Sequence, residues 1–223
     1  MGEHLTLTTA DGFELGAYRA VAGGTEKGRV VVVQEIFGVN HHIRSVCDRL
    51  AAEGYSALAP AIFDRLAPDF QSGYSPDEIA EARKFIPQLD WTKLRLDVGA
   101  AADSLERDGP VAVIGFCLGG SVAFLTATQR DGLAAAICYY GGQIGRHADN
   151  KPLCPTQMHF GDRDQSIPMA DVETIRAKRP DCEIHVYPAG HGFNCDERAS
   201  YDAESAKLAW QRSMTFLAKG FSR

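Results

Sequence analysis

A cysteine flanked by glycines is the first residue whose surroundings could support chemistry. The segment GFCLGG (residues 115–120) follows the apolar run VAVI and precedes a segment typical of a helix. Glycines allow backbones to approach closely around a sharp turn, and a helix that begins after the turn points its positive end at the thiol. That helix end favours a thiolate and an oxyanion beside it. The segment has the form of the G-x-S-x-G nucleophile motif, with Cys117 in place of serine.

Two other interpretations of this segment stay open. Cysteine is among the most buried residue types, so a cysteine in an apolar stretch is usually part of the core. A glycine-rich turn between a strand and a helix can also bind a dinucleotide. However, G-x-x-x-G-G differs from G-x-G-x-x-G, and no acidic residue closes the next strand. The segment alone does not decide between a nucleophile and a core cysteine.

Two polar residues follow the cysteine where a catalytic acid and base are needed. The motifs HFGDRDQSIP and YPAGHGF each continue from a strand-like apolar run. In hydrolases built around the nucleophile turn, the acid and then the histidine come later in the chain, each on a loop that leaves a strand. We therefore assign Asp164 as the acid and His191 as the base. Their local rivals are Asp162, which fits a turn, and His185, which lies within a strand and would point into or across the sheet.

The segment QEIFGVN (34–40) is the third element. It follows the β-branched run RVVVVQE, at the end of the strand that feeds the oxyanion hole in such enzymes. A backbone N–H group from this segment, together with that of Leu118, could stabilise a tetrahedral oxyanion. Removal of one such donor costs about 10²–10³ in rate.

Strand-like and helix-like segments alternate along the chain and must position these residues. We predict strands over 5–9, 13–19, 29–35, 111–116, 133–140, 155–161 and 182–188, and a strand with its exit loop over 55–63. We predict helices over 43–50, from 75, over 91–107 and 118–130, from 168, and over 199–218. Residues 64–75 are expected to form a surface loop that shapes an acyl pocket. The alternation predicts an α/β fold: a mostly parallel sheet of about seven to eight strands with helices on both faces, in a single domain over 1–223.

QEIFGVN, GFCLGG, FGDRDQSIP and AGHGF together resemble the dienelactone hydrolase family, the carboxymethylenebutenolidases of the α/β-hydrolase superfamily. The resemblance runs in order over nearly the whole chain. It implies the α/β-hydrolase fold and hydrolysis of a carboxylic ester or lactone through an acyl-enzyme. It further implies Cys117 as nucleophile, His191 as general base and Asp164 as its orienting acid, with oxyanion-hole N–H groups from Ile36 and Leu118.

The resemblance also gives a role to Glu35. The matching glutamate of the family contacts the thiol in the resting enzyme and helps to regulate when it becomes a thiolate. A nearby negative charge disfavours thiolate formation, so this role is physically reasonable. A neutral thiol held away from His191 would resist oxidation until substrate arrives.

The substrate is less well specified than the catalytic residues. The enzyme acting on dienelactone holds the substrate carboxylate with two arginines, and Cys195 occupies one of those positions here. The other lies in a helix after the loop, near Arg83. Arg65 and Arg198 are further candidates, and Phe37 is a candidate for contact with substrate. We therefore expect a small-molecule carboxylic ester or lactone rather than dienelactone itself.

Composition excludes several other classes of function. The 223 residues are 45% hydrophobic and 23% charged, which is typical of a soluble globular protein. A net charge of -6 with both signs spread along the chain argues against nucleic acid or an anionic membrane as partner. The N-terminus lacks the pattern of a secretion signal, and the six cysteines show no CxxC spacing, so we expect a cytoplasmic protein with reduced thiols. We expect a monomer or weak homo-oligomer.

No cofactor is expected, because acyl transfer through a thiol needs none. No metal is expected either: His41 and His42 are adjacent rather than four residues apart. Two alternative functions stay open. A redox-responsive protein could use Cys117 as a peroxide-sensitive thiol, although no resolving cysteine lies near it in sequence. A non-catalytic binding protein could share the fold, but it would not require the order Cys, Asp, His.

Overall fold

The computed structural model describes residues 2–107 and 109–222. Its contacts divide the chain into two compact units, residues 1–111 and 112–223. The boundary falls at the start of strand β5 (Val111–Phe116). The single domain over 1–223 stays a prediction.

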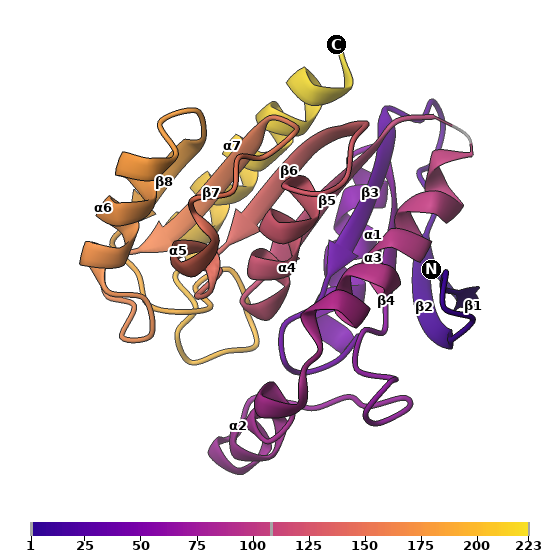
Figure 1. Cartoon of the computed structure of the whole chain (residues 1–223), viewed down its shortest axis with the longest axis horizontal. Coiled ribbons are helices and arrows are strands. Elements are labelled where there is room, and N and C mark those ends of the chain that lie inside the picture. Colours follow the sequence, from indigo (N-terminus) through magenta and orange to yellow (C-terminus); the bar gives the residue numbers. More distant parts are fainter. Residues whose placement is uncertain (1, 108, 223) are drawn as a thin grey trace. The chain divides into compact units, whose positions relative to one another are not determined.

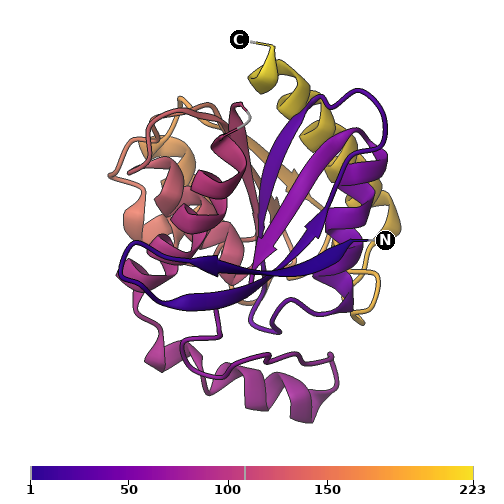
Figure 2. The ribbon, with the colours of Figure 1, turned by 90° about the vertical axis from the view of Figure 1, so that its right-hand side faces the viewer.

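The first unit combines a β-hairpin with a parallel strand pair. Its elements are β1 (Glu3–Thr8), β2 (Glu14–Ala20), β3 (Gly28–Val33), α1 (His41–Ala52), β4 (Tyr55–Pro60), α2 (Pro76–Arg83), the 3₁₀ turn η1 (Ile86–Gln88) and α3 (Trp91–Glu106). The strand order is β1-β2-β4-β3. β2 is antiparallel to β1 and β4, whereas β3 is parallel to β4. Figure 2 shows the hairpin as two long indigo strands, with α2 set apart from the strands of its unit.

Local sequence explains these elements. The four valines from Val30 to Val33 are fully buried, as expected for a β-branched run in a strand covered on both faces. Asn40 caps α1 by accepting from the N–H of Ile43. Ser75 and Glu78 form a capping box at the start of α2, so the helix start predicted from this segment is confirmed.

The second unit is a parallel arrangement with helices between the strands. Its elements are β5, α4 (Leu118–Ala127), β6 (Leu133–Tyr139), α5 (Ile144–His147), β7 (Thr156–Gly161), α6 (Met169–Lys178), β8 (Glu183–Tyr187) and α7 (Ala203–Phe221). The strand order is β5-β6-β7-β8 (Figure 1). β6, β7 and β8 run parallel in register, with Ala136 beside Thr156 and Gln157 beside Glu183. α4 packs on β6, and α7 packs on β6 and β7.

The strands and the longer helices agree with those predicted from the sequence, with shifts at their ends. The last helix was expected from residue 199 but begins at Ala203, because Asp202 accepts from the N–H of Ser205 at 2.9 Å and caps the helix there. α5 and η1 were not predicted. Both are single turns, which are too short to give a periodic pattern.

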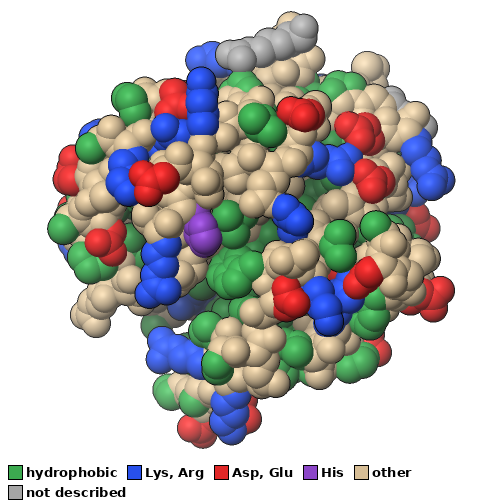
Figure 3. Space-filling model, in the orientation of Figure 1, with side chains coloured by type: hydrophobic (Ala, Val, Ile, Leu, Met, Phe, Trp, Pro, Cys, Tyr) green, Lys and Arg blue, Asp and Glu red, His purple; other side chains and the backbone are tan. Residues whose placement is uncertain are grey.

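Two surface properties bear on the expected partners. None of the helices within residues 2–107 and 109–222 is both long enough and apolar enough to cross a membrane. Acidic and basic side chains are interspersed over the face shown in Figure 3, rather than gathered by sign. The cytoplasmic location stays a prediction.

Candidate active site

Cys117 occupies a strained turn between β5 and α4. Its backbone has φ 55° and ψ −113°, a conformation that residues with a Cβ rarely adopt. The Cys117 N–H donates to the carbonyl of Tyr139 at 3.0 Å, which holds the turn against the end of β6. A Cβ at Gly115 would lie 1.9 Å from the Gly119 oxygen, and one at Gly120 would lie 2.3 Å from the Tyr139 oxygen. The glycines of GFCLGG are therefore required by close backbone approach.

Cys117, His191 and Asp164 form a continuous hydrogen-bonded chain. The Sγ atom of Cys117 lies 3.1 Å from Nε2 of His191, and Nδ1 of the same ring lies 2.7 Å from Oδ2 of Asp164. A carboxylate can only accept, so Nδ1 carries the proton and Nε2 faces the thiol. The sequence predicted that these three residues lie together, and the structure brings them together. The thiol lies beside the imidazole here, rather than held away from it.

The charges around His191 favour its protonated, imidazolium form. Burial opposes the charge on His191, but negative charge on Cys117 and the hydrogen bond with Asp164 outweigh that opposition and raise the pKa of His191 to about 10. The geometry thus suits a thiolate–imidazolium pair. The N-terminus of α4, which begins at Leu118, adds its positive end beside the thiol.

Asp164 is itself held in place by its own loop. Its Oδ1 atom accepts from the N–H groups of Ser166 at 2.8 Å and of Ile167 at 3.1 Å. Its side chain is 1% exposed. Because both oxygens have partners, the carboxylate has a single orientation toward His191, which is what an orienting acid requires.

Tyr140 supports the imidazole, and sequence reasoning missed it. Its ring lies 5.1 Å from that of His191 and is fully buried, at φ 37° directly after β6. The Tyr140 N–H donates to the carbonyl of His159 on β7. A signal was available: in a parallel sheet, residues that follow neighbouring strands meet at one edge. Tyr140 directly follows the strand LAAAICY, just as Cys117 directly follows the strand VAVIGF.

The two rival residues have other surroundings. Asp162 is exposed, its nearest cation is Arg163 at 3.8 Å, and its N–H donates to the carbonyl of Tyr187. His185 lies within β8, with Nε2 2.7 Å from a carboxylate oxygen of Glu183. Neither is the residue that bonds His191 or Cys117.

The candidates Glu35, Ile36 and Phe37 belong to the first unit, as do Arg65 and Arg83. Glu35 is fully buried two residues after the end of β3, and the Tyr74 hydroxyl donates to its Oε2 atom at 3.3 Å. Ile36 lies in the turn that follows. Phe37 packs edge-on against Tyr74, with ring centroids 4.7 Å apart. Asn40 donates to the Tyr74 hydroxyl at 3.0 Å and to the carbonyl of Ser72, which fastens the loop carrying Tyr74 to this segment.

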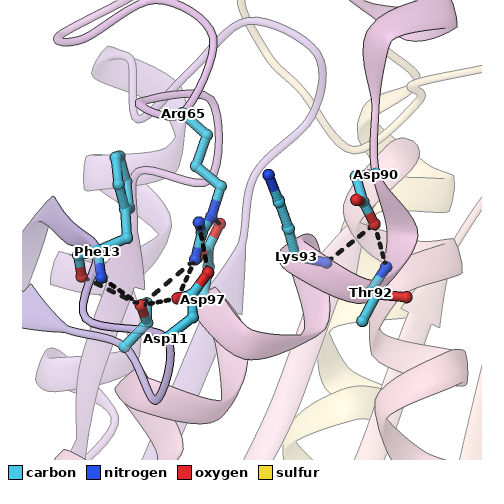
Figure 4. Close-up of polar contacts among 8 residues, drawn as sticks. Asp11, Phe13, Arg65, Asp90, Thr92, Lys93 and Asp97 are labelled. Carbon is cyan, nitrogen blue, oxygen red and sulfur yellow. Dashed lines mark hydrogen bonds and ion pairs between the residues drawn. The ribbon is translucent and has the colours of Figure 1, made fainter.

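Arg65 is committed to ion pairs within the fold. Its guanidinium contacts Asp97 on α3 at 2.8 Å and Asp11 of the β1–β2 hairpin at 2.8 Å, and it stacks 4.3 Å from the Phe13 ring (Figure 4). The Arg65 side chain is 12% exposed. Because its donors are used by two carboxylates, we do not retain Arg65 as a substrate-binding residue. Arg83 is exposed in the last turn of α2.

Comparison with known proteins identifies the family of this chain. The family model of the dienelactone hydrolase family matches residues 15–221. A protein of Synechocystis sp. provisionally named a carboxymethylenebutenolidase is 42% identical over 203 residues, which is 82% of each chain. The carboxymethylenebutenolidase of Pseudomonas putida is 29% identical and covers 97% of this chain and 96% of its own.

A solved structure agrees in fold. The crystal structure of a protein of Klebsiella pneumoniae provisionally named a dienelactone hydrolase aligns with a TM-score of 0.85 at 32% identity, covering 98% of this chain and 99% of that one. An esterase structure from Pyrococcus furiosus, at 16% identity and a TM-score of 0.68, shares the fold alone. The predicted α/β-hydrolase fold with a mostly parallel sheet is thereby confirmed. The chain belongs to the dienelactone hydrolase family, and it is a hydrolase.

Proposed function

We propose that the protein hydrolyses carboxylic esters or lactones through a thioester on Cys117. One observation carries the proposal: the hydrogen-bonded chain from the Cys117 thiol through His191 to the buried carboxylate of Asp164. Nucleophile, base and orienting acid within hydrogen-bond reach of one another are the arrangement that nucleophilic acyl transfer requires. The names of the Synechocystis and Pseudomonas relatives support a lactone or ester as substrate.

In the acylation step, the thiolate of Cys117 attacks the carbonyl carbon while His191 holds the proton. The tetrahedral intermediate collapses as the imidazolium gives that proton to the leaving alkoxide. For a lactone, the new hydroxyl stays attached to the acyl group. The raised pKa of His191 supports this step, because the imidazole keeps its proton until the leaving group needs it.

Deacylation uses the same histidine in its other role. Acylation removes the negative charge from Cys117, and that charge is one of the causes that raise the pKa of His191. The pKa of His191 therefore falls in the acyl-enzyme, so that the ring becomes a neutral base that accepts a proton from water. Water attacks the thioester, and the thiolate leaves as the acid is released. A change of charge at one atom thus switches His191 between acid and base.

The other predicted residues keep their proposed roles. The N–H groups of Ile36 and Leu118 would stabilise the oxyanion, and the Glu35 carboxylate would oppose the thiolate that His191 favours. The buried position of Glu35 and its contact with Tyr74 suit a carboxylate held in one orientation. Arg83 and Phe37 would contact the substrate. No cofactor takes part in the proposed reaction.

Alkylation tests the proposal directly. Hydrolysis of p-nitrophenyl acetate, an uncharged lactone and a dienelactone is measured before and after brief treatment with iodoacetamide at neutral pH. The thiol of Cys154 is a matched control, because it is partly exposed like Cys117 but burial raises its pKa to about 11. Burial also raises the pKa of Cys182 to about 12. We therefore expect mass spectrometry to find the label on Cys117 first.

The expected result is loss of hydrolysis in step with labelling of Cys117, and at least about a thousandfold loss of kcat/KM in Cys117→Ala and in His191→Ala. Cys154→Ala should keep the wild-type rate. Stoichiometric labelling of Cys117 without turnover of any substrate would contradict the proposal and favour a redox-responsive thiol. Full activity of Cys117→Ala would exclude the thioester.

A further inference from the structure

The side chain of Asn40 joins two parts of the first unit. Its Oδ1 atom accepts from the N–H of Ile43 at 3.3 Å and caps α1. Its Nδ2 atom donates to the carbonyl of Ser72 and to the hydroxyl of Tyr74, both at 3.0 Å. The residue is 5% exposed. Both amide hydrogens of Asn40 are therefore used, one for each partner on the loop that carries Tyr74.

The chemistry of these partners fixes the direction of each hydrogen bond. A carbonyl oxygen only accepts and a backbone N–H only donates, so the Asn40 amide has one orientation that satisfies both Ser72 and Ile43. An amide nitrogen only donates, so the Tyr74 hydroxyl accepts from Asn40. The hydroxyl then has its own proton for the Oε2 atom of Glu35, which lies 3.3 Å away. Asn40 therefore directs the Tyr74 proton toward Glu35.

The backbone of the loop that carries Tyr74 is fastened to the segment that follows β3. The N–H of Ser72 donates to the carbonyl of Phe37 at 3.0 Å, and Gln71 forms an antiparallel bridge with Gly38. The ring of Tyr74 packs edge-on against Phe37. These contacts set where the Tyr74 ring lies, but they do not set the rotation of its hydroxyl. The direction of that proton depends on the hydrogen bonds of the hydroxyl itself.

We propose that Asn40 and Tyr74 are positioning residues for Glu35. The relay runs from the Asn40 amide through the Tyr74 hydroxyl to the Glu35 carboxylate, and all three residues belong to the first unit. Glu35 is fully buried, and a buried carboxylate has to be held by donors. The Tyr74 donor partly offsets the negative charge of Oε2, so it weakens the opposition of Glu35 to a thiolate on Cys117. The inference rests on the proposed role of Glu35.

Two substitutions break the relay at different points. Tyr74→Phe removes the hydroxyl and keeps the ring against Phe37. Asn40→Asp keeps an oxygen that caps α1, because aspartate and asparagine are equally good at this position of a helix. Its carboxylate cannot donate to the Tyr74 hydroxyl and accepts from it instead. The hydroxyl proton then turns away from Glu35, although the helix cap and the tyrosine are both still present.

The pH dependence of alkylation at Cys117 reports the change without relying on ester hydrolysis. The rate of labelling by iodoacetamide, followed by mass spectrometry, is proportional to the fraction of thiolate. Tyr74→Phe should move the midpoint of this curve upward by about half a pH unit, so that labelling on its acidic limb slows about threefold. This effect is small for a hydrogen bond, because 3.3 Å exceeds the usual O–H···O distance of about 2.7–2.8 Å. Asn40→Asp should move the midpoint in the same direction.

Two control variants make the same chemical changes outside the relay. Gln71→Glu adds the charge of Asn40→Asp to the same loop, where the side-chain oxygen of Gln71 lies 2.6 Å from Nη1 of Arg44. Tyr201→Phe removes a hydroxyl from a tyrosine that is 43% exposed. Both should leave the midpoint of alkylation where it is in the wild type.

Double variants test the order of the relay. Glu35→Gln should itself move the midpoint downward, and Tyr74→Phe should then cause no further shift, because no charge is left to offset. Asn40→Asp should lose most of its effect in a Tyr74→Phe background, because no hydroxyl is left to direct. A loss of packing would instead shift the midpoint by the same amount in every background.

These outcomes decide the proposal. A midpoint that Tyr74→Phe leaves unchanged or moves downward would overturn it, as would a shift that persists in full in Glu35→Gln. If Glu35→Gln alone leaves the midpoint unchanged, Glu35 does not act on the thiol and the inference fails with that role. The thioester mechanism is decided separately, by the loss of ester hydrolysis in Cys117→Ala. Circular dichroism and urea unfolding check that each variant folds.

Discussion

Asp164 uses each of its carboxylate oxygens for a different purpose. Oδ2 accepts from Nδ1 of His191, while Oδ1 accepts two backbone N–H groups from its own loop. The second set of bonds is present whatever the state of the histidine. In the proposed reaction, Asp164 would therefore act only by fixing the tautomer and orientation of His191 and by stabilising its charge.

Substitution of Asp164 by asparagine distinguishes its bond to His191 from its bonds within its own loop. The amide oxygen can still accept from Ser166 and Ile167, so the loop and the free energy of unfolding should change little. The amide nitrogen would face Nδ1 as a donor and favour the wrong tautomer, so we expect kcat/KM to fall by about 10³–10⁴. Steady-state kinetics with p-nitrophenyl acetate measure the loss. Asp162→Asn, on the exposed neighbour, should retain full activity; equal losses in the two variants would contradict the assignment.

The site residues differ in how far the sequence could predict them. Cys117, Asp164 and His191 could be brought together because chain order and strand ends constrain such residues to one edge of a sheet. The fate of Arg65 could not be predicted. Its carboxylate partners, Asp11 and Asp97, lie 54 and 32 residues away in sequence, and no residue next to Arg65 indicates them. Long-range ion pairs are set by tertiary packing, which a single sequence does not display.

At the scale of elements, periodic patterns predicted the strands and long helices, whereas helix ends depended on single side chains. α7 shows this clearly. The helix was expected to start at about residue 199, but the cap at Asp202 makes it begin at Ala203. Its carboxylate accepts the N–H of Ser205, and this bond lowers the pKa of Asp202 below its usual range.

The cap makes the stability of α7 dependent on pH. Because the pKa of Asp202 is lower in the folded than in the unfolded chain, its contribution is present above pH about 4 and is lost as pH falls through the folded value. Asp202→Ala should lower the free energy of unfolding by about 1 kcal/mol at pH 7. Urea unfolding at several pH values measures this, and the difference from wild type should shrink below pH 4.

A neutral cap is the control for that experiment. Asp202→Asn keeps an oxygen that can accept from Ser205, so it should retain most of the stability at pH 7 without its loss in acid. If Asp202→Ala and wild type unfold at the same urea concentration at pH 7, the helix end is held by packing rather than by its cap.

For the whole molecule, composition and topology agree on a globular enzyme. The net charge is -6, and acids and bases are interspersed on the face shown in Figure 3, which gives no support for a polyanion as partner. The alternation of strands and helices that predicted the fold reflects which residues are buried. The spacing of apolar residues in a sequence indicates that burial directly.

The backbone conformation of Cys117 lowers the stability of the fold. Its φ of 55° costs a residue with a Cβ about 1–3 kcal/mol, a cost that glycine escapes. Cys117→Gly should therefore unfold at higher temperature than Cys117→Ala, the reverse of their usual order, although both lack the thiol. Differential scanning calorimetry would detect the gap, and equal melting temperatures would mean that the turn relaxes without cost. If Cys117 is the nucleophile, as proposed, the strain at its backbone is the part of the folding free energy that the protein gives up to place a thiol at this turn.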